Sequence, residues 1–96
     1  EALTTNLAES RRFLQLSVGL STQYDETVIK NVDTHKLALT SDILAVLASF
    51  TEAQASTKEG RDQLALALKD VINARLVLLE GFGGVEDVFF PSFVLQ

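Results

Sequence analysis

Two arginines occupy positions where a charged side chain needs a partner. On a helical projection Arg75 falls among apolar residues such as Leu68 and Leu79, away from any polar strip, and Arg11 falls beside a second apolar stripe that includes Leu7. A guanidinium on a buried face must be paired, because an unpaired buried charge is strongly destabilising. Arginine at these two positions therefore indicates either an ion pair or a bound anion.

Asp42 flanks an apolar stripe in the middle of the sequence and is the natural partner for Arg75. An interhelical or intersubunit ion pair would fix the register of the two segments, and snorkelling of the long arginine stem is a further structural explanation. In the functional alternative, the arginines hold a ligand carboxylate in an apolar cavity. We favour the structural interpretation because ion pairs are the commoner reason for such an arginine, and we keep Arg11, Asp42 and Arg75 as interface or ligand candidates.

The remaining polar residues predict no catalytic or metal site. His35 is the single histidine and there is no cysteine, so neither a His-x-x-x-His metal pair nor a thiolate can form. Asp25-Glu26 and Glu86-Asp87 are neighbours in sequence, and adjacent helix residues point apart. No Gly-x-Ser-x-Gly element is present. We predict a protein that is not an enzyme and uses no cofactor or metal.

The charge pattern excludes nucleic acid as a partner. The net charge is −5, the eight Lys and Arg residues are scattered, and Arg11-Arg12 is their one adjacent pair. Binding to a phosphate backbone depends on clustered cations that displace counterions. The longest uncharged run is Phe13 to Tyr24, shorter than the roughly 18 apolar residues that a bilayer crossing needs. We therefore predict no nucleic-acid binding and no transmembrane segment.

The start of the chain bears on its compartment. The sequence contains no methionine and begins with Glu-Ala, so we expect that Glu1 follows a cleavage or marks the boundary of an excised piece. Secretory processing after a dibasic site can leave Glu-Ala, which gives a slight preference for secretion and otherwise leaves the compartment open.

Glycines divide the sequence into three segments with helical periodicity. The composition is 47% hydrophobic with a single proline, which suits a helical bundle. We expect helices over about 2–18, ended by Gly19, over about 24–57, and over about 61–80 after Gly60. The middle segment forms either one long helix or two helices with a break at Thr40-Ser41.

The middle segment has apolar residues on two faces. One stripe follows helical spacing: Val28, Val32, His35, Leu39, Ile43, Val46, Phe50 and Ala53. A second set, Leu37, Leu44 and Ala48, covers the opposite side. Such a helix lies in the middle of a bundle or contacts another subunit. We predict one all-α domain over 1–96: a small bundle of three to four helices over 1–84 and a hydrophobic C-terminal extension over 85–96.

The C-terminal extension, "VEDVFFPSFVLQ", is apolar and carries the only proline, Pro91, so we expect extended or turned backbone there. Freely exposed, it would exceed the apolar patch that soluble monomers tolerate. It must therefore pack on the bundle as a lid, on a neighbouring chain, or on a lipid or another protein. Phe89, Phe90, Phe93 and Val94 are its interface or ligand candidates.

These observations predict a non-enzymatic structural or protein-interaction module. It would form a homo-oligomer or bind a protein partner through its surplus apolar helix faces and the C-terminal extension. One alternative is a carrier of a fatty-acid-like ligand, with Arg75 or Arg11 at the head group and "GFGG" at 81–84 acting as a hinge for the terminal segment. Another alternative is a secreted membrane-active or toxin-like subunit.

Overall fold

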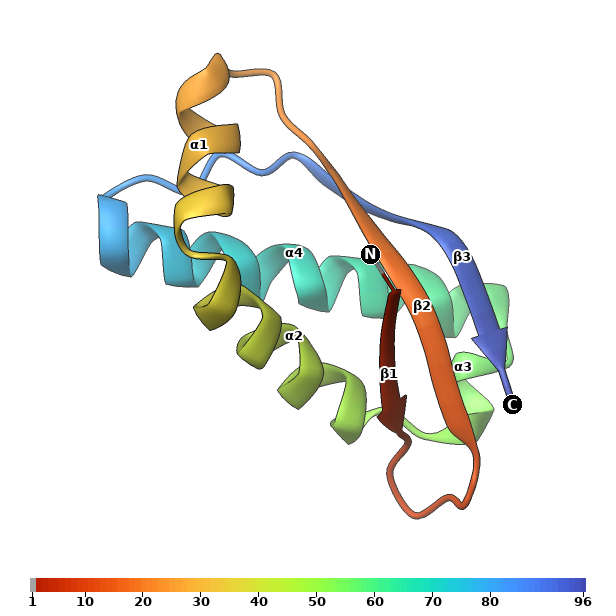
Figure 1. Ribbon diagram of the computed structural model, residues 1–96. Coiled ribbons are helices and arrows are strands. Elements are labelled where there is room, and N and C mark those ends of the chain that lie inside the picture. The colour runs from red at the N-terminus through yellow and green to blue at the C-terminus, as the bar shows by residue number, and fades with distance from the viewer. Residues whose placement is uncertain (1) are drawn as a thin grey trace.

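The computed structural model describes residues 2–96 and shows that the prediction of an all-α bundle is wrong (Figure 1). The chain is a mixed α/β protein with a three-stranded antiparallel sheet in the order β1-β2-β3. Its elements, in chain order, are β1 (Ala2–Asn6), β2 (Phe13–Ser21), α1 (Glu26–Thr34), α2 (Lys36–Ser49), α3 (Glu52–Ala55), α4 (Lys58–Glu80) and β3 (Asp87–Leu95).

The first predicted helix is a β-hairpin instead. Apolar residues alternate along β2 with the period of two that one buried strand face requires, and Leu14 and Leu16 on that face are fully buried. β1 runs antiparallel to β2 and places Leu3 opposite Leu16. Gly19 does not end a helix but lies within β2, where the ring of Phe89 covers it; an added Cβ would lie 2.3 Å from that ring.

The C-terminal extension is the third strand of this sheet, so the expectation of extended backbone around Pro91 is confirmed. β3 pairs antiparallel with β2 along its length, with a register shift between Ser17 and Gly19. Opposite this shift, Phe90 and Pro91 form a bulge in β3. Proline lacks an N–H group and is tolerated in a sheet at bulges and edge strands, and Pro91 meets both conditions.

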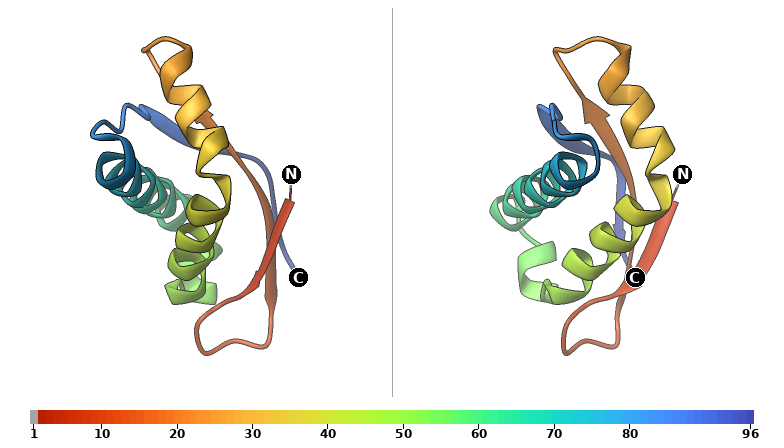
Figure 2. Two further views of the ribbon diagram at one scale, coloured as in Figure 1. Left: turned by 60° about the vertical axis from the view of Figure 1, so that its left-hand side comes forward. Right: turned by 90° about the vertical axis from the view of Figure 1, so that its left-hand side faces the viewer.

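All four helices lie on one side of the sheet (Figure 2). α2 contacts β1, and α4 contacts β3 and α2. Helical spacing places a fully buried stripe on the face of α4 that meets the core: Leu64, Leu68, Ile72 and Leu76. α2 contributes the buried residues Leu39, Ile43 and Leu47 to the same core. None of the helices in residues 2–96 is long and apolar enough to cross a membrane.

The predicted middle segment, 24–57, consists of three helices. The first break falls at His35, between α1 and α2, whereas Thr40 and Ser41 lie inside α2. Short polar side chains cap the starts: Asp25 accepts a hydrogen bond from the Thr27 amide at the start of α1.

The predicted helix over 61–80 is confirmed as α4. It begins earlier than expected, because Thr57 caps it and Gly60 lies in its first turn. Gly81 ends it with φ at 79°, the left-handed conformation expected of a C-terminal glycine. The Asn73 side chain then holds the connection to β3, accepting from the Val85 amide at 2.8 Å and donating to the Val85 carbonyl at 2.9 Å. The expected hinge is therefore fixed in place by hydrogen bonds.

Gly60 is predicted to be the glycine least tolerant of substitution. A Cβ at this position would lie 1.7 Å from the Gln54 carbonyl oxygen, so Gly60→Ala must displace either α3 or the start of α4. We expect a loss of roughly 3 kcal/mol in the free energy of unfolding, measured by urea denaturation. Gly81→Ala is the matched control: nothing lies within 4 Å of its Cβ, and its left-handed backbone costs about 1 kcal/mol. If Gly60→Ala and Gly81→Ala lowered the free energy of unfolding equally, the close approach of Gly60 to the Gln54 carbonyl would be contradicted.

Candidate interaction surface

The sheet has one face that no helix covers within residues 2–96 (Figure 2). Because side chains alternate along a strand, the residues between the buried positions point to this side. We call this set the outer sheet face: Ala2, Thr4 and Asn6 from β1, Phe13, Gln15, Ser17, Gly19 and Ser21 from β2, and Asp87, Phe89, Ser92 and Val94 from β3.

The outer sheet face mixes apolar and neutral polar side chains, and its one charged residue, Asp87, lies at the end of the face opposite Ser21. Its three large apolar side chains are about half exposed: Phe13 46%, Phe89 50% and Val94 47%. Gln15 lies opposite Val94, and the hydroxyl oxygens of Ser17 and Ser92 lie 3.0 Å apart and satisfy one another. A face that carries exposed aromatic and branched side chains, with its charge confined to one end, is typical of a protein-interaction surface.

The other side of β3 forms a groove with the start of α4. Phe90 and Phe93 turn towards the helices, and their ring centroids lie 5.4 Å apart. The Arg61 guanidinium lies over the Phe93 ring, 4.6 Å from its centroid, in a cation–π contact. Lys58 lines the same groove, which we call the β3–α4 groove. Of the four predicted extension residues, Val94 belongs to the outer sheet face, and Phe90 and Phe93 line this groove. Phe89 lies on the outer sheet face and also lines the groove.

Arg75 and Asp42 form the expected ion pair, which links α4 to α2. The Arg75 Nε donates to Asp42 Oδ2 at 2.7 Å, and Nη2 donates to Oδ1 at 2.9 Å, giving a bidentate contact. Hydrogen bonds from Arg75 hold the pKa of the Asp42 carboxyl below its usual value, and the same pair raises the pKa of Arg75. Both oxygens of Asp42 are engaged, so the geometry is that of a structural link between helices.

Arg11 does not lie beside a buried helix face, because the segment that carries it is the exposed β1–β2 loop. Its neighbour Arg12 makes the contacts that sequence reasoning missed. Arg12 Nη1 donates to Glu52 Oε1 at 2.9 Å and Nη2 to the Leu95 carbonyl at 3.2 Å, and Ser10 donates to the same carboxylate at 3.0 Å. Hydrogen bonds from Arg12 and then Ser10 lower the pKa of Glu52. The sequence feature that could have pointed to Arg12 is its place in Arg11-Arg12, the one adjacent basic pair of the sequence.

His35 has a structural partner. Its Nε2 lies 2.6 Å from Glu80 Oε2, which joins the α1–α2 junction to the end of α4. Within residues 2–96, no group of three His, Cys, Asp or Glu side chains is placed to hold a metal ion.

Removing the Asp42 carboxylate should change the acid dependence of stability. The pKa of Asp42 is lower in the folded chain than its usual 3.8, so the pair stabilises the fold above that pH and loses its effect as pH falls through the folded pKa. At neutral pH we expect Asp42→Asn to cost about 1 kcal/mol, a difference from the parent chain that shrinks below pH 3.8.

Chemical denaturation over a pH series measures this difference. Asp62→Asn is the control, because the Lys58–Asp62 pair is far more exposed, at 89% and 63% of the two side chains, and contributes little. If Asp42→Asn lowered the free energy of unfolding by the same amount at every pH, the stabilising role assigned to the Arg75–Asp42 ion pair would be contradicted.

Comparison with known proteins gives the chain a family. The family model described as "Flagellar basal body-associated protein FliL" matches residues 1–96. The flagellar protein FliL of Aquifex aeolicus is 32% identical over 93 residues, which is 95% of this chain and 55% of that relative. The chain therefore spans about half the length of the curated relative that it matches. The match extends over every element of the fold, and the chain belongs to the FliL family of flagellar basal body-associated proteins, which are not enzymes.

Proposed function

We propose that this chain is a protein-binding module of the flagellar basal body, which docks a protein component of the motor through the outer sheet face. The observation that carries the proposal is the uncovered face itself, with Phe13, Phe89 and Val94 exposed on it and no charge between them. The family description supplies the setting, since it associates these proteins with the basal body.

The dimensions of the face indicate a reversible contact. β2 has nine residues. With about 3.3 Å per residue and roughly 4.8 Å between strands, three strands offer a face of about 30 by 14 Å, or roughly 400 Å². A standard stable interface buries about 800 Å² on each partner. The outer sheet face alone therefore supports a weak or exchangeable complex, which suits a protein that associates with a rotating motor.

The adjoining β3–α4 groove extends this contact. Lys58 and Arg61 line it beside the Phe93 ring, so a partner that continues around the edge of β3 meets two cations next to an aromatic surface. Arg61 already lies on Phe93, and Lys58 Nζ is 3.1 Å from Asp62. Carboxylates on the partner at this edge would complement the cations and fix its orientation.

A flagellar family favours this role over the carrier and the toxin-like alternatives. A basal body is a protein assembly. A member of a family associated with it therefore needs a surface that binds protein, whereas it has no evident need for a lipid-carrier or toxin-like site. The surface that the chain offers for this purpose is built from rigid strands, which bind with little loss of conformational freedom.

Charge placed on the outer sheet face should abolish docking without unfolding the chain. We expect Val94→Asp to weaken binding to isolated basal bodies at least tenfold, because the partner would bury an unpaired carboxylate, and to lower motility in cells that carry the variant. Val94 is 47% exposed, so the free energy of unfolding should fall by less than about 1 kcal/mol.

Leu66→Asp on α4 is the matched control, since Leu66 is 59% exposed and lies on a helix away from the outer sheet face. Co-sedimentation measures binding, and urea denaturation measures stability. The proposal fails if Val94→Asp and Leu66→Asp bind equally well, or if only unfolded variants lose binding.

A further inference from the structure

The net negative charge of the chain is concentrated in two segments of the sequence. Residues 19–29 and 77–87 carry five carboxylates and no lysine, arginine or histidine, whereas the rest of the chain carries eight acidic and eight basic side chains. The net charge of −5 therefore belongs to these two segments. All five of their carboxylates are exposed: Asp25, Glu26, Glu80, Glu86 and Asp87.

The fold brings the two segments together at one end of the molecule. The Thr22 hydroxyl donates to the Gly84 carbonyl at 2.8 Å, and the rings of Tyr24 and Phe82 meet edge to face with their centroids 4.8 Å apart. In both views of Figure 2, α1 lies between this junction and the N-terminus. Asp87 lies at the adjoining end of the outer sheet face. We call the following set the acidic end patch: Tyr24, Phe82, Asp25, Glu26, Glu80 and Glu86.

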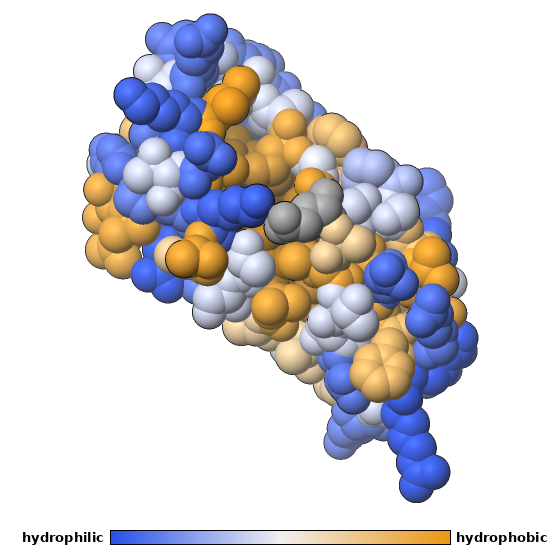
Figure 3. All heavy atoms as spheres, viewed as in Figure 1, coloured by the Kyte–Doolittle hydropathy of each residue, from blue (hydrophilic) through white to orange (hydrophobic). Residues whose placement is uncertain are grey.

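The acidic end patch combines charge with exposed apolar surface. Tyr24 is 59% exposed and Phe82 is 43% exposed, and the last turn of α4 adds exposed Val77, Leu78 and Leu79. Figure 3 shows apolar side chains at the left edge of the molecule, over the end of α4, with hydrophilic residues above and below them. Large apolar side chains that gather at one exposed place are typical of a binding surface.

The backbone holds the pair of rings in place. Gly84 has φ at 82°, and a Cβ at this position would lie 2.7 Å from the Phe82 ring and 2.8 Å from Val28. The turn therefore fits closely around the Phe82 ring. Asn73 fixes the next residue, Val85, through two hydrogen bonds. A surface that is already ordered binds a partner with little loss of conformational freedom.

Glu86 shares a hollow of about 370 Å³ with Tyr24 and Gly84. No ion pair of the described residues uses Glu86, and the same holds for Glu26 and Asp87. A cation in this hollow would meet an aromatic side chain and an opposite charge together, and each of these contacts favours it.

The chain's own positive groups engage the other side of the acidic end patch. Lys30 lines a separate hollow with Glu26 and Glu80, and the His35 Nε2 lies 2.6 Å from Glu80 Oε2. The hollow beside Glu86 has no lysine, arginine or histidine among the described residues that line it. This side is therefore left for a cation of a partner.

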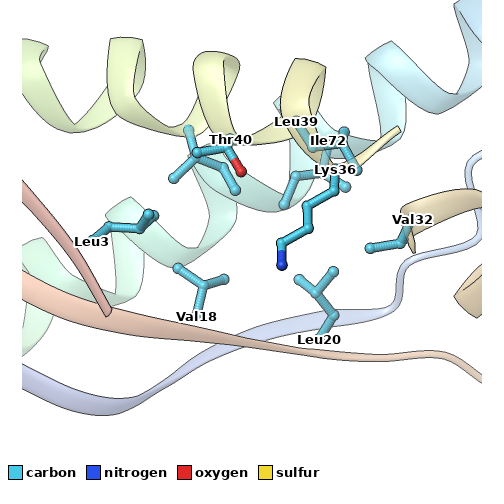
Figure 4. A pocket seen from close by; sticks show the side chains of 9 residues that line it. Leu3, Val18, Leu20, Val32, Lys36, Leu39, Thr40 and Ile72 are labelled. Carbon is cyan, nitrogen blue, oxygen red and sulfur yellow. The ribbon is translucent and has the colours of Figure 1, made fainter. Parts of the chain in front are cut away.

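The apolar hollow between β2 and α2 does not offer a cation a comparable site. It has a volume of about 140 Å³, and Lys36 extends from α2 towards Val18 and Leu20 there (Figure 4). None of the described residues that line it is acidic. A cation in this hollow would leave water for a largely hydrocarbon surface, so it is drawn to the acidic end patch in preference.

We infer that a basic segment of a partner protein binds the acidic end patch and places an arginine on the Tyr24 ring. Arginine suits this position better than lysine, because its planar and weakly hydrated guanidinium stacks on an aromatic face and still donates to a carboxylate at its edge. Glu86 accepts from this arginine, and further cations of the segment meet the neighbouring carboxylates. The charge at this end of the molecule also steers the segment to the site from a distance.

The fluorescence of Tyr24 reports binding directly, because Tyr24 is the single tyrosine of a chain without tryptophan. The probe is the unlabelled octapeptide Ser-Arg-Gly-Arg-Ser-Arg-Gly-Ser, titrated into the whole chain. We expect a saturable change in Tyr24 emission at about 50 mM NaCl and at least a fivefold loss of affinity at about 300 mM, because salt screens exposed charges. The same peptide with lysine in place of arginine should bind at least threefold more weakly.

Matched charge reversals locate the site. Glu86→Lys should weaken peptide binding at least tenfold, because repulsion replaces attraction beside the ring. Glu59→Lys changes the net charge equally but lies in the first turn of α4, so it should change binding less than twofold. Tyr24→Ala, followed by calorimetry, should weaken binding at least fivefold, and the chain should stay folded because Tyr24 is 59% exposed. Val94→Asp should change peptide binding less than twofold, so this inference and the proposed function can fail separately.

Four results would overturn the inference. Absence of a saturable change in Tyr24 emission would remove it, and equal losses in Glu86→Lys and Glu59→Lys would show that the peptide responds only to net charge. Equal binding of the arginine and lysine peptides would contradict an arginine on the ring. If spermidine binds as tightly as the peptide, the acidic end patch takes a small cation and not a segment of a protein.

Discussion

The contact between one face of α4 and the inner face of the sheet is the interaction on which the rest of the structure depends. Leu64, Leu68, Ile72 and Leu76 recur every four residues along the helix, and all are fully buried. With roughly 2 kcal/mol for each buried side chain, the stripe contributes on the order of 8 kcal/mol, comparable with the whole stability of a small domain. Because α4 crosses the sheet and ends at Gly81, it also returns the chain in position to pair β3 with β2.

This arrangement leaves the sheet with one covered face. Residues 2–96 supply a single layer of helices, and that layer lies on the inner side of the sheet. On the outer sheet face, Phe89 lies over Gly19, and Ser17 and Ser92 satisfy each other by a hydrogen bond. Its exposure is therefore a consequence of the same packing that stabilises the domain.

Helical periodicity alone was enough to predict α4, its glycine C-terminus and the Arg75–Asp42 pair, since all three depend on residues within or between regular helices. The strands were not predicted, although Leu14, Leu16, Val18 and Leu20 alternate, because a short apolar run fits both periods. What decides between them is pairing with β3, some seventy residues away in the sequence. The role of the C-terminal aromatic residues as interface or ligand candidates stays a prediction, and the sides on which they lie depend on the bulge at Pro91.

The outer sheet face and the layer of helices differ in how firmly the packing holds them. The outer sheet face is formed by β-strands whose other side is a close-packed core, so its shape is fixed. In the layer of helices, α2 is held to α4 through Arg75 and Asp42, whereas α1 has Val28 as its buried residue. A nine-residue helix with so little burial opens more readily than the rest of the domain. The first helix is thus the part of the domain that can shift most readily, whereas the outer sheet face must find a partner that already fits.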